Sequence, residues 1–497
     1  MSAMTQIALT IQADDQRTLQ EQVFDAIREM ILSGRIGMGN PVPGSRALAA
    51  QLGISRNTVI IAYDKLLSEG YLEIRSNVGT FVSTDLPERS LSSDRSTRRE
   101  GSDAARSATV FAEMSAGFAV QSVRNPDTAR LHTDFWVGRT DSRHFPERDL
   151  RRIFDVKLRS GGAHHGSYTP AEGFAALRRT IADHIGPSRG VDCTPEDVVV
   201  TSGSQDGLML IARALQGHCT TFLHEDPGYQ GACYLFAQSG YVCRAIPVDS
   251  DGLIVSALPE GRRMLLYVTP SHQFPTGVTL SLARRLELLD WAARTDSVII
   301  EDDYDGDFRY DGAPLTALRG LDRDGRVLYL GTFSKSIAPG LRLGYIVGSA
   351  ASAPSLARWK QLLSNGVPWL LQSAMADFME SGRFQRHLRR IRVLYKARRD
   401  TLIAAIETRF PGSAIAGRRG GMHISWRLPD AGCARLLQRR ALLRGIGIYT
   451  VEGGGASLSP GNDRHRDVLM LGYAAVDEAR IARAIDVLAE IDVRQGG

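Results

Sequence analysis

The chain has 497 residues, of which 43% are apolar and 23% charged, so it is long enough for two or three soluble globular domains. No apolar run approaches the roughly 20 residues of a membrane span, and the N-terminus lacks the pattern of a signal peptide. The five cysteines are scattered without a CxxC pair, which argues against disulfides and zinc. We therefore expect a cytoplasmic protein with no metal site and no membrane partner. The net charge of +5 permits a polyanionic partner but does not demand one.

Residues 12–84 are expected to form a compact N-terminal unit that begins with three helices. Residues 19–33 place apolar side chains on one helical face, and Gly34 can end that helix. Residues 46–52 predict a second, shorter helix, and Ser55 is a suitable N-cap for the third. The turn between these last two helices is short, as in a helix-turn-helix motif.

Two predicted strands, residues 71–74 and 80–83, follow the helices and complete a winged helix-turn-helix. In this motif the first turn of the recognition helix reaches base edges in the major groove, and the wing contacts phosphates. The residues expected to contact DNA are Arg46, Ser55, Arg56, Asn57 and Thr58 on the helices and Arg75, Gly79 and Thr80 on the wing. Residues 1–90 carry eight Lys and Arg against ten Asp and Glu, so bulk charge does not support this interpretation. The alternative is a helical protein-interaction module.

Residues 55–59, Ser-Arg-Asn-Thr-Val, and residues 69–72, Glu-Gly-Tyr-Leu, closely resemble the GntR family of bacterial repressors. The resemblance implies that the partner is double-stranded operator DNA.

Residues 85–128 differ in composition from the segment before them. They are polar, mixed in charge and poor in aromatic side chains, which predicts a flexible linker.

Five apolar runs in the remaining chain are expected to be strands, and each ends in polar, aromatic or glycine-rich residues. The runs are residues 197–201, 221–223, 263–268, 297–301 and 326–330. Ligands of open α/β sheets bind beyond the carboxyl ends of the strands, so these ends predict the rim of a binding site. After them come helical patterns at 354–407 and a small α+β portion with strands at 421–426 and 468–473.

Lys335 lies just beyond one of these strand ends, where a lysine of lowered pKa can form a Schiff base with an aldehyde. A Ser-Lys pair alone fits a solvated surface lysine equally well. Arg342 follows seven residues later, residues 302–304 read Asp-Asp-Tyr, and residues 275–277 read Pro-Thr-Gly. Along the chain, these motifs follow one another as they do in the fold-type I aminotransferases that depend on pyridoxal 5′-phosphate (PLP). The chain resembles that family over about residues 130 to 490.

A GntR-type head on an aminotransferase-like body is the signature of the MocR/GabR subfamily of transcription regulators. Ser-His-Gln-Phe-Pro-Thr-Gly at 271–277 and Glu-Asp-Asp-Tyr at 301–304 are typical of that subfamily. The resemblance implies a multidomain chain, in which residues 129–497 form an α/β PLP-binding domain with a small C-terminal α+β part.

The resemblance also assigns roles around the cofactor ring. Lys335 would hold PLP as a Schiff base and is the one catalytic residue expected. Asp302 would pair with the pyridine nitrogen, although Asp303 beside it competes for that role and either carboxylate fits an ordinary ion pair. Tyr304 would donate to the ring oxygen, and Tyr229 would stack on the ring unless it is a core tyrosine.

The cofactor phosphate needs backbone amides at a helix N-terminus together with a cation. The residues expected around it are Ser204, Gln205, Thr332, Ser334 and Arg342. By resemblance, Tyr168 would reach the phosphate from a neighbouring subunit, which implies a homodimer. His272 would lie near the cofactor, and a structural histidine is an equal alternative.

Three positions depart from the aminotransferase pattern. Phe274 stands where an asparagine usually bonds the ring oxygen, and Met470 stands where an arginine usually clamps the substrate carboxylate. Relatives that sense γ-aminobutyrate have a further arginine at the position of Gly231. Arg464 and Arg466 are possible replacements for the missing clamp.

These observations favour a PLP-dependent transcription regulator that senses PLP or an amine or amino acid. Two alternatives stay open at this point. One is a working aminotransferase that carries a DNA-binding head, and the other is a DNA-binding protein whose body is only a dimerisation scaffold. The missing arginine weighs against the first, and the intact Lys335, Asp302 and Arg342 weigh against the second.

Overall fold

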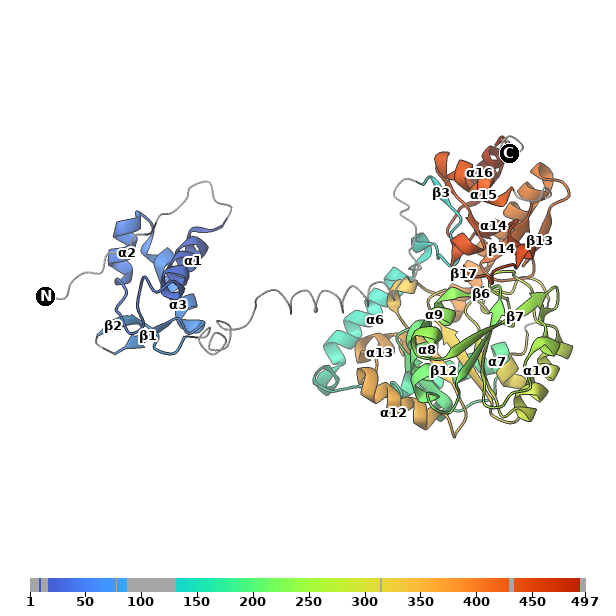
Figure 1. Ribbon diagram of the computed structural model, residues 1–497, viewed down its shortest axis with the longest axis horizontal. Coiled ribbons are helices and arrows are strands. Elements are labelled where there is room, and N and C mark those ends of the chain that lie inside the picture. The colour runs from blue at the N-terminus through green and yellow to red at the C-terminus, as the bar shows by residue number, and fades with distance from the viewer. Residues whose placement is uncertain are drawn as a thin grey trace. The chain divides into compact units, whose positions relative to one another are not determined.

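The computed structural model describes residues 9, 17–76, 78–86, 131–312, 315–428 and 433–491. The chain divides into two compact units, residues 1–120 and 121–497 (Figure 1). Most of the predicted linker, 87–128, lies outside the described residues, as do residues 12–16 of the predicted N-terminal unit.

The first unit has the predicted winged helix-turn-helix architecture. Its elements are α1 (Leu19–Leu32), α2 (Ser45–Leu52), α3 (Arg56–Ser68), β1 (Leu72–Arg75) and β2 (Gly79–Val82). Thr18 caps α1 in a capping box with Glu21, and Gly53 ends α2 in the left-handed conformation at φ 67°. β1 and β2 pair in antiparallel register. The apolar faces of the three helices form one core that includes Ile27, Leu48 and Val59.

The second unit is built on an eight-stranded sheet whose order is β4-β12-β11-β10-β9-β5-β7-β8. The strands are β4 (Val198–Thr201), β5 (Thr221–Asp226), β7 (Val242–Asp249), β8 (Gly252–Leu253), β9 (Leu265–Val268), β10 (Val298–Asp302), β11 (Val327–Thr332) and β12 (Gly344–Val347). The five predicted strands are all present and run parallel to one another. The sheet is nevertheless mixed, because β12 runs antiparallel between β11 and β4.

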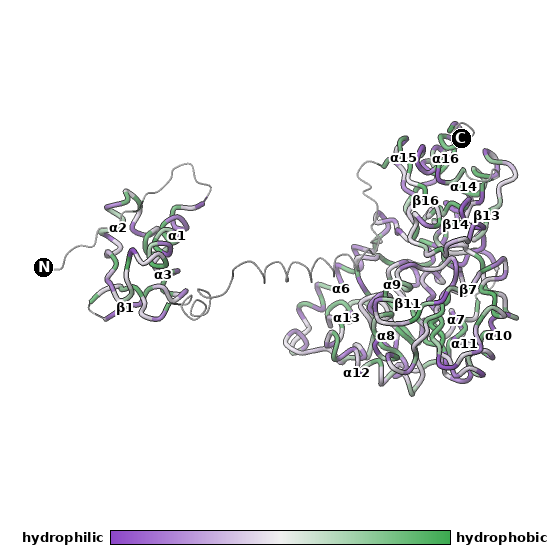
Figure 2. The backbone as a smooth tube through the Cα atoms, viewed as in Figure 1, coloured by the Kyte–Doolittle hydropathy of each residue, from purple (hydrophilic) through white to green (hydrophobic). Residues whose placement is uncertain are grey.

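Side chains that alternate along the strands fill a core on each face of this sheet. Val199, Leu330 and Ile346 pack against α8 (Ser204–Ala214), α9 (Gln230–Gln238) and α12 (Ala353–Ser364). Their neighbours Val200 and Tyr345 face the opposite side, with α7 (Ala175–Arg189) and α13 (Trp369–Glu380). α10 (Leu282–Arg294) and α11 (Leu318–Leu321) continue that side. The hydrophobic stretches, green in Figure 2, accordingly run through the middle of the unit.

The C-terminal part, orange to red in Figure 1, holds a second, four-stranded sheet in the order β13-β14-β18-β16. Its strands are β13 (Ala414–Ala416), β14 (His423–Arg427), β16 (Tyr449–Thr450) and β18 (Val468–Gly472). Its helices are α14 (Arg383–Arg409), α15 (Ala434–Leu443) and α16 (Glu478–Ala489). The unit also contains helix α6 (Glu147–Ser160) and the short strands β3 (Thr133–Asp134), β6 (Gly228–Tyr229), β15 (Ile446–Gly447) and β17 (Ala456–Ser457). None of the described helices has the length and hydrophobicity that a bilayer-spanning segment requires.

Candidate cofactor site and nucleic-acid interface

Lys335 lies just beyond the end of β11, half-buried inside the larger unit. Its Nζ donates to the carbonyl oxygen of Gly138 at 2.9 Å. Gly138 has φ 83°, and a Cβ at this position would lie 2.5 Å from Nζ of Lys335. Any other residue at position 138 would therefore clash with the lysine side chain. Burial lowers the pKa of Lys335, and the charges of Asp305 and Asp302 oppose that shift. A lowered pKa increases the neutral fraction of the amine, which is the nucleophilic form.

Asp302 is the last residue of β10 and is buried, with a side chain that is only half satisfied. Its Oδ2 accepts a 2.7 Å hydrogen bond from the hydroxyl of Tyr267. Its Oδ1 is buried and has no hydrogen-bond partner among the described residues. Burial raises the pKa of Asp302 to about 7, Asp303 and Asp305 add to that rise, and Tyr267 and Lys335 oppose it. An unpaired buried carboxylate oxygen is the partner that a protonated ring nitrogen needs.

Asp303, the predicted competitor, is engaged elsewhere. It forms an ion pair with Arg189, at 2.5 Å from Nε, and accepts a 2.7 Å hydrogen bond from Tyr329. Oδ1 of Asp303 is also buried without a partner among the described residues, but Arg189 already compensates the charge of this carboxylate, so Asp302 is the better partner for a cationic ring.

The aromatic side chains expected around the ring lie close together. Tyr229 packs edge-on against Phe274, with ring centroids 5.9 Å apart, and its hydroxyl accepts from Nε2 of Gln205 at 2.8 Å. The hydroxyl of Tyr304 donates to the carbonyl oxygen of His272 at 3.0 Å. Because a hydroxyl has a single proton, Tyr304 must give up this bond before it can donate to the ring oxygen, which is the role that the resemblance implied.

A cradle for an anion forms where α8 begins. Ser204 and Gln205 are the first residues of this helix, so their backbone N–H groups are free of intrahelical partners. A Cβ on the preceding Gly203 would lie 3.2 Å from the guanidinium of Arg342, which places that cation against the helix start. No carboxylate of the described chain forms an ion pair with Arg342. Thr332 and Ser334 bond to each other, through a 3.1 Å contact from the Ser334 N–H to the Thr332 hydroxyl.

These features fit PLP. The unpaired Oδ1 of Asp302 suits the ring nitrogen, the half-buried Lys335 suits the aldehyde, and the cradle at Gly203 suits the phosphate. Tyr168 is not part of this group, because its side chain is 87% exposed. Its donation to the cofactor phosphate of a neighbouring subunit stays a prediction.

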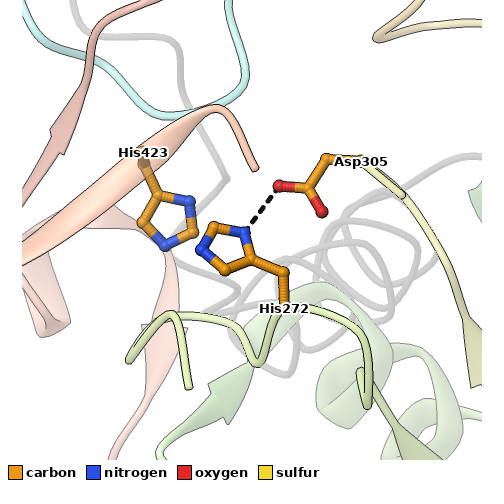
Figure 3. A group of neighbouring side chains, drawn as sticks. All are labelled: His272, Asp305 and His423. Carbon is orange, nitrogen blue, oxygen red and sulfur yellow. Dashed lines mark hydrogen bonds and ion pairs between the residues drawn. The ribbon is translucent and has the colours of Figure 1, made fainter. Parts of the chain in front are cut away.

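His272, Asp305 and His423 form a buried group at the junction with the C-terminal part (Figure 3). Oδ2 of Asp305 lies 2.7 Å from Nδ1 of His272 and accepts from the N–H of Met422 at 3.2 Å. Burial is the main cause that lowers the pKa of His423 to about 3, and the neighbouring His272 lowers it further. The ligand atoms of the three lie within 4.8 Å of one another, which is close enough for a metal ion. Nε2 of His272 and Nδ1 of His423 are buried without a hydrogen-bond partner among the described residues, and the absence of a metal site stays a prediction.

The departures from the aminotransferase pattern leave no carboxylate clamp at the expected place. Met470 is fully buried and packs with Phe274 in an apolar cluster that Tyr229 and Tyr304 also contact. A Cβ on Gly231 would lie 2.6 Å from the hydroxyl of Tyr229 and 2.7 Å from Nε2 of Gln205, so no side chain fits there.

The suggested replacements for the clamp do not fill this gap. Arg464 is exposed, and Arg466 is an exposed residue that pairs with Asp463 at 2.8 Å.

Sequence reasoning missed Gly138 and Tyr267, which hold Lys335 and Asp302. Tyr267 reaches Asp302 because β9 and β10 pair in parallel with Ile300 opposite Tyr267. Gly138 is 197 residues away from Lys335 along the chain. Neither position belongs to a motif, so nothing local in the sequence identifies them.

The recognition helix α3 presents the predicted side chains at its first turn. The Oγ of Ser55 accepts from the N–H of Thr58 at 3.1 Å, which caps the helix. Arg46, Arg56 and Asn57 are exposed. Nε of Arg56 lies 3.4 Å from the hydroxyl of Ser45, a weak contact that leaves the guanidinium available to a base.

The wing differs from the expectation of a free cation. Arg75 forms an ion pair with Glu73 at 2.7 Å, and its guanidinium lies 4.5 Å from the ring centroid of Phe81. Gly79 takes φ 140°, which suits glycine at the start of β2, and Thr80 is half-buried beside it. Arg75 must therefore exchange its carboxylate partner before it can hold a phosphate.

Comparison with known proteins accounts for both units. Residues 19–82 match the family model of bacterial regulatory proteins of the gntR family, and residues 151–488 match aminotransferase class I and II. The chain is 34% identical, over 97% of its length and 95% of the relative's, to the probable rhizopine catabolism regulatory protein MocR of Rhizobium meliloti. It is 32% identical, over 84% of its length and 85% of the relative's, to the pyridoxine biosynthesis transcriptional regulator PdxR of Corynebacterium glutamicum.

Among solved structures, the second unit is similar to the α-aminoadipate aminotransferase LysN of Thermus thermophilus, solved in complex with N-(5′-phosphopyridoxyl)-L-leucine. The TM-score is 0.67 at 28% identity, over 77% of this chain and 97% of that one. The likeness confirms the fold-type I aminotransferase architecture expected from the sequence. With its GntR-type winged helix and its class I and II aminotransferase domain, this chain belongs to the MocR/GabR subfamily of helix-turn-helix transcription regulators.

Proposed function

We propose that the protein is a PLP-dependent transcription regulator that acts as a homodimer in the bacterial cytoplasm. Its winged helix binds operator DNA, and its aminotransferase-like body senses PLP or an amine or amino acid that reacts with it. The observation that carries the cofactor proposal is the buried Oδ1 of Asp302, which has no partner in the described chain. Leaving such an oxygen unpaired is costly, and a ring cation removes that cost.

PLP, when bound, supplies an aldehyde that reacts reversibly with amines. The chain's own residues would prepare the site for it. Lys335 is held by the Gly138 carbonyl at 2.9 Å and has a lowered pKa, which favours a neutral amine. Arg342 lies against the start of α8, where a phosphate would meet both a cation and free backbone amides.

The absence of a carboxylate clamp favours a sensor over an efficient transaminase. Met470 and Gly231 take the positions of two arginines, and the first is buried among apolar side chains while the second has no room for a Cβ. Fixing the substrate's orientation supplies much of the rate of such reactions. An amine can therefore exchange with Lys335 without being turned over quickly. Occupancy by the amine would then change the relative populations of two body conformations, which is how a ligand alters DNA affinity.

Tyr168 supports the dimer. An 87% exposed tyrosine is unusual on a monomer surface, and it suits a side chain that enters a partner subunit's site. The relatives named as a regulatory protein and as a helix-turn-helix transcriptional regulator support the DNA-binding role.

The test follows the visible cofactor spectrum and operator affinity together while amines and 2-oxo acids are added. We expect amines or PLP to change DNA affinity while conversion to the amine form of the cofactor stays negligible. Rapid multiple turnover with operator affinity unchanged would establish the enzyme alternative instead. Lys335→Ala should abolish the visible absorption, and Lys396→Ala, at an exposed lysine on α14, is the matched control. A colourless wild-type protein that PLP cannot reconstitute would refute the cofactor proposal.

A further inference from the structure

The larger unit contains a cavity of about 660 Å³, whose lining includes His272 and Asp305 from the surroundings of the cofactor site. Its walls come from the chain after the Pro-Thr-Gly turn, from residues 305–309, and from residues 415–421 of the C-terminal part. Lys335, Tyr229 and Met470 are not among the described residues that line it. The volume lies in the range of about 300–1,000 Å³ that is usual for small-molecule sites.

Five arginines line this cavity, together with the aspartates Asp251, Asp305 and Asp307. Three of the five have carboxylate partners: Arg189 pairs with Asp303, Arg392 with Asp307, and Arg418 with Glu407. The other two, Arg309 and Arg419, form no ion pair with any described carboxylate. The cavity therefore has two guanidinium groups that form no ion pair within the described part of the chain.

Arg309 gives the stronger evidence for a bound anion. Its Nε is buried and has no hydrogen-bond acceptor in the described chain. Burial lowers the pKa of Arg309, the charges of Arg419 and Arg285 lower it further, and Asp311 opposes the shift. Two like charges brought together at a cavity wall, one with an unsatisfied buried donor, destabilise the protein unless an anion joins them.

The rest of the lining defines what else the ligand should carry. Leu280, Phe308 and Ile415 supply an apolar wall. An inorganic ion would leave that wall in contact with water, whereas an organic anion would cover it. The guanidinium groups suit a carboxylate or a phosphate, because each offers paired donors to two acceptor oxygens.

We propose that this cavity is a second ligand site, separate from Lys335, which binds a small organic anion through Arg309 and Arg419. The anion carries a carboxylate or a phosphate ester together with an apolar portion.

His272 connects this site to the cofactor residues. It lines the cavity, its Nε2 has no partner within the described residues, and its carbonyl oxygen accepts the hydroxyl proton of Tyr304 at 3.0 Å. A ligand that moved His272 would thereby move Tyr304. Binding itself depends on neither the cofactor nor the winged helix, so the inference stands or falls separately from the proposed function.

The experiment is calorimetric titration of the full-length protein, loaded with PLP and freed of excess. The two probes are glutarate and pyridoxine 5′-phosphate, which carry no aldehyde or amine that could react at Lys335. We expect saturable binding of at least one probe at a single site, and the preferred probe identifies the carboxylate or the phosphate ester as the anion. Each of Arg309→Gln and Arg419→Gln should weaken binding by at least about tenfold, as expected for losing a charge-assisted hydrogen bond.

Arg262→Gln is the matched control, since Arg262 is an exposed arginine of the same unit outside the cavity. Because Arg419 is exposed, its substitution should leave the fold intact even if that of the partly buried Arg309 does not. The inference is overturned if neither probe binds saturably, if binding survives Arg419→Gln, or if Arg262→Gln weakens it to the same extent.

Discussion

The hydroxyl of Tyr267 donates a 2.7 Å hydrogen bond to Oδ2 of Asp302, across the neighbouring parallel strands β9 and β10. The bond occupies one carboxylate oxygen and leaves the other, Oδ1, facing no described partner. Tyr267 thus fixes the orientation of the carboxylate, and it stabilises the ionised form against a burial effect that raises the pKa of Asp302 to about 7.

Removing this hydroxyl should weaken cofactor binding without disturbing the fold. A hydrogen bond to a charged group is worth about 1.5–3 kcal/mol, so Tyr267→Phe should raise the dissociation constant for PLP by about 10- to 100-fold. Equilibrium dialysis followed by absorbance would measure it. Tyr241→Phe is the control, because this buried tyrosine donates to the Ala212 carbonyl away from the site. Equal affinity of Tyr267→Phe and wild type would contradict the assigned role.

Asp302 should also give the cofactor-free protein a characteristic pH dependence. Its pKa rises from 3.8 to about 7 on folding, so between these values the folded chain keeps a proton that the unfolded chain has lost. Stability should therefore fall as the pH rises from about 4 to about 7, by up to about 4 kcal/mol for this group. Glu225 and Glu301 shift in the same direction and add to the effect.

The variant Asp302→Asn isolates the contribution of Asp302 to this pH dependence of stability. The variant should unfold at higher denaturant concentration than wild type at pH 8, and the difference should shrink towards pH 4. Urea titrations of the two proteins across this range would measure it. A constant difference at all pH values would show that Asp302 is ionised in the cofactor-free protein.

The resemblance to the aminotransferases assigns the roles of Lys335, Asp302 and Arg342, and the apolar runs before Asp302 and Lys335 are the strands β10 and β11 of the structure. The sequence also predicts the winged helix, because the N-cap residues and the glycines that end its helices are local signals. β12 was missed because Gly344–Val347 follows at once after the loop that holds Lys335 and Arg342, so no turn signal separates it from that motif. The partners of the functional residues were missed for a different reason: strand register and long-range packing place Tyr267 and Gly138, and no local pattern encodes either. Glu73 was missed because its pairing with Arg75 depends on side-chain conformation.

Arg56 should read a base. Its guanidinium is exposed at the first turn of α3 and has only a 3.4 Å contact with Ser45. Arg56→Ala should cost about 1–3 kcal/mol of operator binding and relax specificity at one base pair. Fluorescence anisotropy with operator variants would measure both. Arg35→Ala, at an exposed arginine in the turn after α1, serves as the control. A uniform loss over all sequences would show that Arg56 contacts a phosphate.

Glu73 should limit the affinity of the wing for DNA. It holds Arg75 in an ion pair at 2.7 Å, and both side chains are partly exposed. Glu73→Gln should free Arg75 for a phosphate and remove a like charge, so DNA binding should tighten and depend more steeply on salt. Arg75→Ala should have the opposite effect on all sequences alike. Affinities over a range of salt concentrations give the slopes, and identical slopes for the two variants would exclude the wing from the interface.

Glycine should be required at position 231, because a side chain there would displace Tyr229 and Gln205 of the cofactor site. A Cβ there would lie 2.6 Å from the hydroxyl of Tyr229 and 2.7 Å from Nε2 of Gln205, both well inside contact distance. Those two side chains are joined by a 2.8 Å hydrogen bond, and Gln205 also opens α8. A methyl group would push the ring of Tyr229 away from the position in which it is expected to cover the cofactor.

Gly231→Ala should therefore weaken PLP retention while secondary structure stays unchanged. Moving a stacking ring and breaking a neutral hydrogen bond together cost about 1–3 kcal/mol, or roughly 5- to 150-fold in affinity. Gly166→Ala is the control, because a Cβ at Gly166 meets nothing within 4 Å. Dialysis of both variants against PLP, with circular dichroism alongside, gives the comparison. If Gly231→Ala binds PLP as tightly as Gly166→Ala, Tyr229 moves without cost and is not part of the ring site.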